Sequence, residues 1–153
     1  MILAEDLLSY SKELYKTANS EEVALRNVAR NSYYALFHEL ATIELKSIPI
    51  TERSFGSHEQ LIQQLRASDD EIHRKLGILL ASLKSIRTKA DYKLHQRFTD
   101  HDARSTMLKV DRAFKDLSEL EPDEEIDIEN DLGTSEQSIK SVSNNPPKLS
   151  IVK

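Results

Sequence analysis

Residues 20–46 decide the fold, and they read SEEVALRNVARNSYYALFHELATIELK. Their apolar residues, from Val23 to Ile43, recur at helical spacing and cover a wide part of the helix circumference. A helix with so wide an apolar face lies at the centre of a bundle, where neighbouring helices cover it on several sides. Asn19 followed by Glu22 is the pattern of a capping box, which places the helix start at about residue 20. The sequence therefore predicts a long central helix.

The flanking sequence predicts four further helices. Ser57 with Gln60, and Ser68 followed by Asp69-Asp70-Glu71, have the pattern of helix starts. The connections between the helices are short, which favours antiparallel neighbours. We therefore expect an all-α fold, an antiparallel up-and-down bundle of four long helices and one short one. The long helices are expected over residues 3–18, 20–46, about 69–96 and from 99 or 100, and the short one from 57.

The composition excludes several other classes of protein. With only 3 Gly and 4 Pro in 153 residues, the chain is too poor in turn residues for an all-β or a doubly wound fold. The absence of Cys excludes disulfides, thiolate metal sites and a Cys nucleophile. No apolar run approaches the ~18–20 residues that span a bilayer, and residues 1–6 lack the basic start of a signal peptide. We expect a cytoplasmic protein that does not enter a membrane.

The net charge of −5 is unevenly distributed. Residues 1–120 hold 18 Lys and Arg and 18 Asp and Glu, whereas residues 121–153 hold 3 basic and 8 acidic residues. We therefore expect a helical domain over 1–120 and an acidic, Ser-, Asn- and Pro-containing tail over 121–153 that is disordered. Short apolar segments at 126–128 and 149–152 leave open that the tail anchors a partner. The neutral helical domain is compatible with a nucleic-acid partner.

Residues 84–97 read KSIRTKADYKLHQR and hold five Lys or Arg with one Asp and one His. Arg87, Asp91 and His95 are spaced at i, i+4 and i+8, so a helix through all three places them on one stripe. An Arg beside a carboxylate and an imidazole could bind a phosphate and move a proton. The alternative is an Arg–Asp helix pair of about 0.3–0.5 kcal/mol, with His95 as an ordinary surface residue.

Within the predicted central helix, residues 30–38 read RNSYYALFH. This run holds one Arg, three aromatic residues and one His, and Arg30, Tyr34 and His38 lie near one another on the helix surface. Such a surface could line a binding cleft. The alternative is that the aromatic residues are core side chains, because large aromatics at helical spacing usually pack, and that His38 is a hydrogen-bonded packing residue.

Three segments in this order resemble the HEPN superfamily: RNSYYALFH at 30–38, SHEQL at 57–61 and RTKADY at 87–92. The resemblance covers about residues 1–120 and is strongest to the small stand-alone bacterial and archaeal members. It implies an up-and-down helical bundle that usually dimerises and that associates with RNA or a nucleotide. It also implies a role in a toxin–antitoxin or anti-phage defence system, often beside a small nucleotidyltransferase.

The resemblance also implies roles for individual residues. In the ribonucleases of the family, an Arg-x(4–6)-His motif from each protomer meets at the dimer cleft. Here four residues separate Arg87 from Tyr92, which occupies a position where the motif would have its His. The first downstream His is His95, with seven intervening residues. The candidate catalytic pair is Arg87 for the phosphate and His95 as the base, in a metal-independent ribonuclease. The candidate binding residues are Arg30, Tyr34, His38, Lys84, Lys89, Asp91 and Tyr92.

No metal and no cofactor are expected, because the five His residues are scattered and form no His-x-x-x-His pair. Two other functions stay open from the sequence. The protein could be a non-enzymatic dimeric subunit that recruits a larger partner through residues 121–153. The acidic tail could also cover the basic helix and mimic a nucleic acid, since opposite charges attract and salt screens that attraction.

Overall fold

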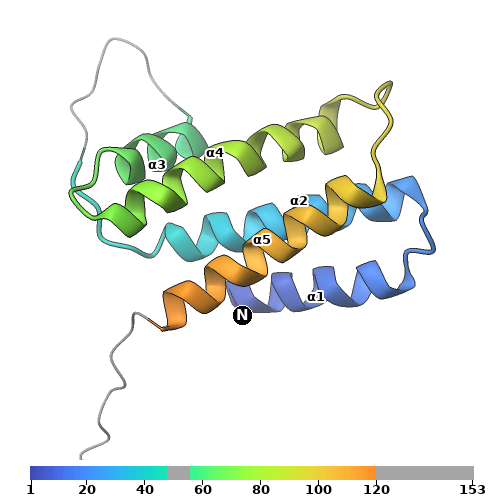
Figure 1. The fold of residues 1–153 in the computed structure, drawn as a ribbon, viewed down its shortest axis with the longest axis horizontal. Helices are drawn as coiled ribbons and strands as arrows, with labels where there is room; N and C mark the ends of the chain where they lie inside the picture. The colour runs from blue at the N-terminus through green and yellow to red at the C-terminus, as the bar shows by residue number, and fades with distance from the viewer. Residues whose placement is uncertain (48–55, 120–153) are drawn as a thin grey trace, which may run out of the picture. The chain divides into compact units, whose positions relative to one another are not determined.

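The computed structural model describes residues 1–47 and 56–119, and these residues contain five helices and no strand. The all-α prediction is therefore confirmed for the described part of the chain (Figure 1). The predicted tail over 121–153 lies outside the described residues. The helices are α1 (Ala4–Thr17), α2 (Glu22–Leu40), α3 (Ser57–Arg66), α4 (Glu71–Tyr92) and α5 (Asp100–Ser118).

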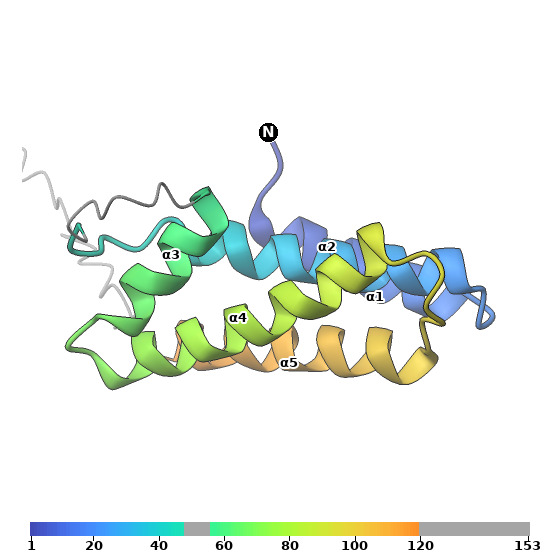
Figure 2. The same cartoon turned by 90° about the horizontal axis from the view of Figure 1, so that it is seen from above.

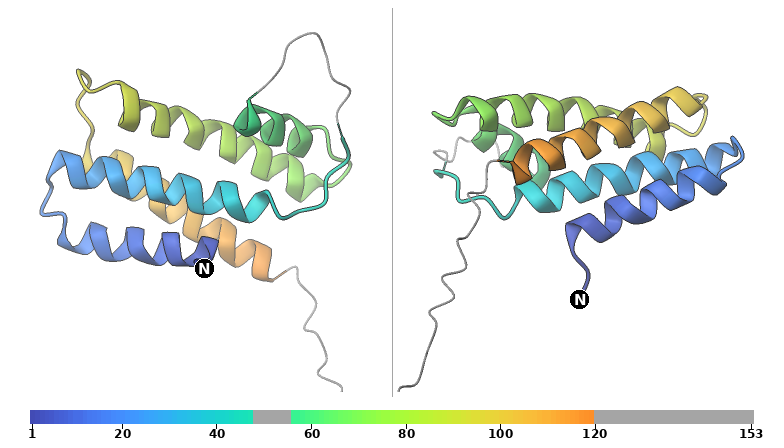
Figure 3. Two further views of the ribbon diagram at one scale, coloured as in Figure 1. Left: turned by 180° about the vertical axis from the view of Figure 1, so that it is seen from behind. Right: turned by 60° about the horizontal axis from the view of Figure 1, so that its bottom comes forward.

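Helix α2 is the central element. It packs against α1, α4 and α5, while α3 packs on α4, and Figure 2 shows α3 beside the first turns of α4. Helices α1 and α2 run in opposite directions, and so do α4 and α5 (Figures 1 and 3). The wide apolar face of α2 explains its position, because each neighbouring helix covers a different part of that face.

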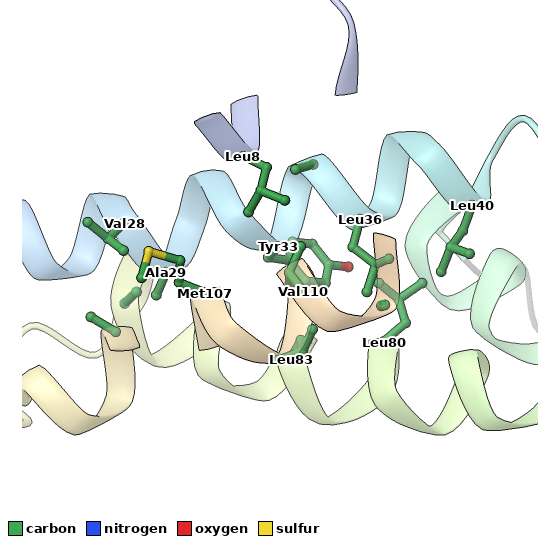
Figure 4. Packing of buried hydrophobic residues seen from close by; sticks show 14 of the residues in the cluster. Leu8, Val28, Ala29, Tyr33, Leu36, Leu40, Leu80, Leu83, Met107 and Val110 are labelled. Carbon is green, nitrogen blue, oxygen red and sulfur yellow. The ribbon is translucent and has the colours of Figure 1, made fainter. Parts of the chain in front are cut away.

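The core is formed where three helices, α1, α4 and α5, converge on α2. Figure 4 shows Leu8 of α1, Leu80 and Leu83 of α4, and Met107 and Val110 of α5 directed at side chains of α2. Burying one such aliphatic side chain contributes about 1.5–3 kcal/mol to folding. The α2 side chains in this cluster include Leu25, Val28, Ala29, Tyr33, Ala35, Leu36 and Leu40.

The helices begin close to the predicted residues, but the residues that cap them differ from the predicted patterns. Asp70 caps α4 by accepting from the backbone N–H of Ile72 at 2.7 Å, and Thr99 caps α5 in a capping box with Asp102. The predicted box of Asn19 and Glu22 does not form. Asn19 and Ser20 have φ of 45° and 63°, so they form a left-handed turn between α1 and α2 instead. At α3, Gly56 holds the N-cap position and Ser57 is already the first helical residue.

The long helices end earlier than predicted, α2 at Leu40 and α4 at Tyr92. The cause at α4 is the buried guanidinium of Arg26. It donates to the carbonyl oxygens of Lys89 at 3.0 Å, Ala90 at 2.9 Å and Gln96 at 2.6 Å. A helix end leaves such carbonyls without intrahelical donors, so Arg26 satisfies them from a different helix. The local sequence near residue 92 contains no sign of this donor.

Candidate functional site

The two segments that the sequence singles out meet in the structure. The guanidinium carbon of Arg87 lies 5.3 Å from the ring centre of Tyr33, 5.4 Å from that of Tyr34 and 5.9 Å from that of Tyr92. Distances of this size allow a cation–π attraction. We call the surrounding group the Arg87 cluster. It comprises Arg30, Tyr33, Tyr34, Phe37 and His38 of α2, His58 and Glu59 of α3, and Lys84, Arg87, Asp91 and Tyr92 of α4.

Arg87 is a buried cation whose polar atoms are only partly satisfied. The residue is 8% exposed, and its Nε has no hydrogen-bond partner among the described residues. Its Nη1 lies 3.5 Å from a carboxylate oxygen of Asp91. Because buried polar groups are nearly always hydrogen-bonded, an unpartnered Nε on a buried Arg requires an explanation. The surrounding aromatic rings supply part of it, and a ligand could supply the rest.

Asp91 lies between two guanidiniums that belong to different helices. Its carboxylate is 3.5 Å from Nη1 of Arg87 on α4 and 3.7 Å from Nε of Arg30 on α2. Charge-assisted hydrogen bonds are usually about 2.7–2.9 Å long, so both pairs are loose. The Arg30 side chain is 53% exposed, and Tyr92, which follows Asp91 in the chain, is 70% exposed. This edge of the cluster therefore presents positive charge and an aromatic ring to solvent.

Tyr33 and His58 form the buried side of the cluster. The Tyr33 hydroxyl lies 2.8 Å from Nδ1 of His58. Burial raises the pKa of Tyr33 to about 12, so its hydroxyl keeps its proton at neutral pH. Burial, and then the positive charges of Arg87 and Lys84, lower the pKa of His58, so its ring is neutral there. A protonated phenol and a neutral imidazole are matched as donor and acceptor.

Lys84 is in the cluster, but its charge is already paired. Its ammonium donates to Glu59 of α3 at 2.6 Å, and Glu59 also accepts from Gln63 at 2.8 Å. These hydrogen bonds from Lys84 and Gln63 lower the pKa of the Glu59 carboxyl. Lys84 therefore joins α3 to α4 and adds positive potential near Arg87.

His38 lies at the exposed edge of the cluster. Its ring stacks on Tyr34, with 6.2 Å between the ring centres, and meets Phe37 edge-on at 5.3 Å. His38 also borders a pocket of about 510 Å³ that Ile2 and Leu3 line on the α1 side. The aromatic residues are partly core, as the packing interpretation expects, yet they also surround Arg87.

Two predicted site residues lie elsewhere. Lys89 is directed at α5, where it pairs with Asp102 at 2.9 Å and faces the ring of Phe98 at 5.4 Å. His95 is exposed and follows the end of α4 by three residues. The expected helical stripe from Arg87 through Asp91 to His95 is therefore wrong beyond Asp91.

His58 is the residue that the sequence reasoning missed as part of the site. It appeared only as one letter of the 57–61 segment, and a short helix gives no periodic signal that directs one side chain toward Arg87. In the structure its ring lies 4.1 Å from that of Phe37 and 5.6 Å from that of Tyr33.

A larger groove of about 610 Å³ lies between α4 and α5, away from this cluster. Apolar side chains such as Leu76, Leu79 and Leu117 line it, and none of the predicted site residues borders it. In the described residues, no group of three or more His, Asp or Glu side chains could hold a metal ion. Nor is any helix in that part of the chain both long and apolar enough to cross a membrane.

No family model matches this chain, and the searches of curated proteins and of solved structures likewise return no match.

Proposed function

We propose that this protein binds a phosphate-bearing ligand, RNA or a nucleotide, at the Arg87 cluster, as a HEPN-like antiparallel helical bundle. One observation carries the proposal: the guanidiniums of Arg30 and Arg87, from two helices, converge on the carboxylate of Asp91 at 3.7 and 3.5 Å. A phosphate presents the same kind of acceptor and carries more negative charge. A bound phosphate can therefore accept hydrogen bonds from both guanidiniums, which lie 3.5 and 3.7 Å from the Asp91 carboxylate.

The aromatic residues of the cluster supply the second half of a nucleotide site. The ring of Tyr92 is exposed, and the ring of Tyr34 is half-buried beside Arg30, 6.0 Å from its guanidinium carbon. Bases stack on such rings, and each stacked base contributes about 1–3 kcal/mol with little preference for sequence. The combination of cations and exposed rings supports a nucleotide or single-stranded RNA over inorganic phosphate.

The proposal is for binding. Metal-independent cleavage of RNA also needs a base within hydrogen-bond reach of the attacking hydroxyl. His95, the sequence-predicted base, follows the end of α4 and is exposed. Ribonuclease activity, a homodimer, a nucleotidyltransferase partner and a place in a toxin–antitoxin or anti-phage system stay predictions from the resemblance.

The test is a binding titration with a fluorescent single-stranded oligoribonucleotide and, separately, with AMP at low salt. We expect Arg30→Ala to weaken binding about three- to tenfold, because it removes one half-exposed charged donor. Arg112→Ala is the matched control, since Arg112 is exposed on α5 and lies outside the cluster. The proposal is wrong if the wild-type protein binds neither probe, or if both variants weaken binding equally.

A further inference from the structure

His58 joins α3 to the aromatic residues of α2. It is the second residue of α3, and its ring contacts those of Tyr33, Tyr34 and Phe37 at 5.6, 5.7 and 4.1 Å between centres. One of its two ring nitrogens, Nδ1, lies 2.8 Å from the Tyr33 hydroxyl. The ring is therefore fixed both by stacking and by one directed hydrogen bond.

The direction of that hydrogen bond follows from the protonation of the two groups. The Tyr33 phenol is protonated and the His58 imidazole is neutral near pH 7, for the reasons given above. The protonated phenol donates to Nδ1, so the ring carries its own proton on Nε2. His58 thereby fixes the hydroxyl end of Tyr33, and the face of the Tyr33 ring lies against the Arg87 guanidinium.

We propose that His58 is a positioning residue of the Arg87 cluster, which acts by holding the Tyr33 ring in the place where it contacts the Arg87 guanidinium. Arg87 depends on this contact because its guanidinium has few hydrogen-bond partners. Its Nε has no partner in the described part of the chain, and its nearest carboxylate is 3.5 Å away. The Tyr33 ring, 5.3 Å from the guanidinium carbon, is the fully buried ring among the three that surround it.

If the Arg87 side chain were held less firmly in one conformation, ligand binding would weaken. A ligand phosphate must find the guanidinium in a fixed orientation, because a mobile side chain loses conformational entropy when it binds. Loss of the His58–Tyr33 hydrogen bond therefore weakens binding without removing any group that touches the ligand. The effect on ligand binding depends on the proposed function, whereas the effect on the mobility of the Arg87 side chain does not.

The experiment is a double-mutant cycle of Tyr33→Phe and His58→Phe, read out by oligoribonucleotide binding. Each variant keeps an aromatic ring and removes one partner of the hydrogen bond. We expect each single variant to weaken binding about three- to tenfold and the double variant to weaken it no further, because both delete the same interaction. His58→Asn, whose amide oxygen can replace Nδ1 as the acceptor, should restore most of the affinity.

A second readout needs no ligand. The hydrogen-exchange rate of the Arg87 Nε–H, measured by NMR in the free protein, should rise several-fold in both Phe variants and return toward the wild-type rate in His58→Asn. His101→Phe is the control, because His101 is exposed on α5. Thermal unfolding of each variant identifies the folded fraction to which both readouts refer.

The outcomes separate the two proposals. If the wild type binds RNA and Arg30→Ala weakens binding, but Tyr33→Phe and His58→Phe do not, the positioning role is wrong and the proposed function stands. If the wild type binds no probe, the proposed function is wrong, and an unchanged Arg87 exchange rate then overturns the positioning role as well. If His58→Phe does not fold, Tyr33→Phe decides, since it removes a single oxygen atom.

Discussion

At the scale of single residues, the charge of Asp91 has two opposite effects. Its carboxylate compensates the buried guanidinium of Arg87 and the half-exposed guanidinium of Arg30, which favours the folded state. The same carboxylate occupies the donors that a phosphate would use. A residue that stabilises the empty site therefore competes with the ligand for it.

We expect Asp91→Asn to increase the affinity for an oligoribonucleotide about threefold at low salt, because the neutral amide competes less well for the two guanidiniums. The same variant should unfold at a lower temperature than the wild type. Asp116→Asn, which changes an exposed carboxylate on α5, is the control for a general effect of net charge. A loss of affinity in Asp91→Asn would show that the carboxylate orients the Arg side chains for the ligand.

A second consequence at this scale is a dependence of stability on pH. Burial lowers the pKa of His58 below its ordinary value of 6.5, with further contributions from Arg87 and Lys84 of α4 and from His38 of α2. The Tyr33 hydroxyl also borders the ring, and the Glu59 carboxylate acts on Tyr33. As the pH falls below 6.5, the unfolded chain binds a proton that the folded chain does not bind, so the folded state loses stability until the lower pKa is reached.

Denaturant titrations between pH 7 and pH 5 measure this effect. We expect the decrease in unfolding free energy over this range to be smaller in His58→Asn than in the wild type. His101→Asn serves as the control, because it removes an exposed histidine from α5. Equal slopes for the two variants and the wild type would contradict a lowered pKa of His58.

At the scale of the elements, the contact of α3 with α4 depends on Gly77. A Cβ atom at this position would lie 2.9 Å from Cβ of Leu65 and 3.0 Å from the backbone N of Arg66. Carbon atoms do not approach that closely without displacement, so a larger residue would push α3 away from α4. Since His58 belongs to α3, the close packing of α3 on α4 also determines where His58 lies relative to the Arg87 cluster.

We expect Gly77→Ala to destabilise the protein by about 1–3 kcal/mol through overpacking. This outcome opposes helix propensity, which by itself favours Ala over Gly by about 1 kcal/mol. Gly56→Ala is the matched control, because no atom lies within 4 Å of the Cβ it would add. A Gly77→Ala protein as stable as the wild type in urea denaturation would mean that α3 shifts at little cost.

At the scale of the whole molecule, the sequence predicted which helices form and which one is central. The wide apolar stripe of residues 23–43 is a local signal, and α2 indeed packs against three helices. The helix ends were less predictable, since the donor that ends α4 is Arg26, far away in the chain. Among the predicted capping patterns, only the Ser68–Glu71 segment contains the residue that caps a helix, and that residue is Asp70.

The candidate site was predictable to a similar degree. Spacing placed Arg87 and Asp91 on one face of their helix, and that prediction is confirmed by their ion pair. Spacing cannot tell which element lies opposite that face, so neither the contact of Lys89 with α5 nor the role of His58 could be found. His95 was misplaced because the same reasoning extended the helix beyond Tyr92.

The guanidinium of Arg26 also has a consequence for the order of folding. It joins α2 to carbonyls at least 63 residues away in the chain, so the intervening chain must be closed before its hydrogen bonds form. We expect these bonds to be absent from the transition state. Arg26→Met should then unfold about tenfold faster or more in stopped-flow experiments, with a folding rate within about twofold of the wild type. Arg30→Met, at a half-exposed position one turn later, is the control. By this account, Arg26 determines how long the native state lasts once it has formed.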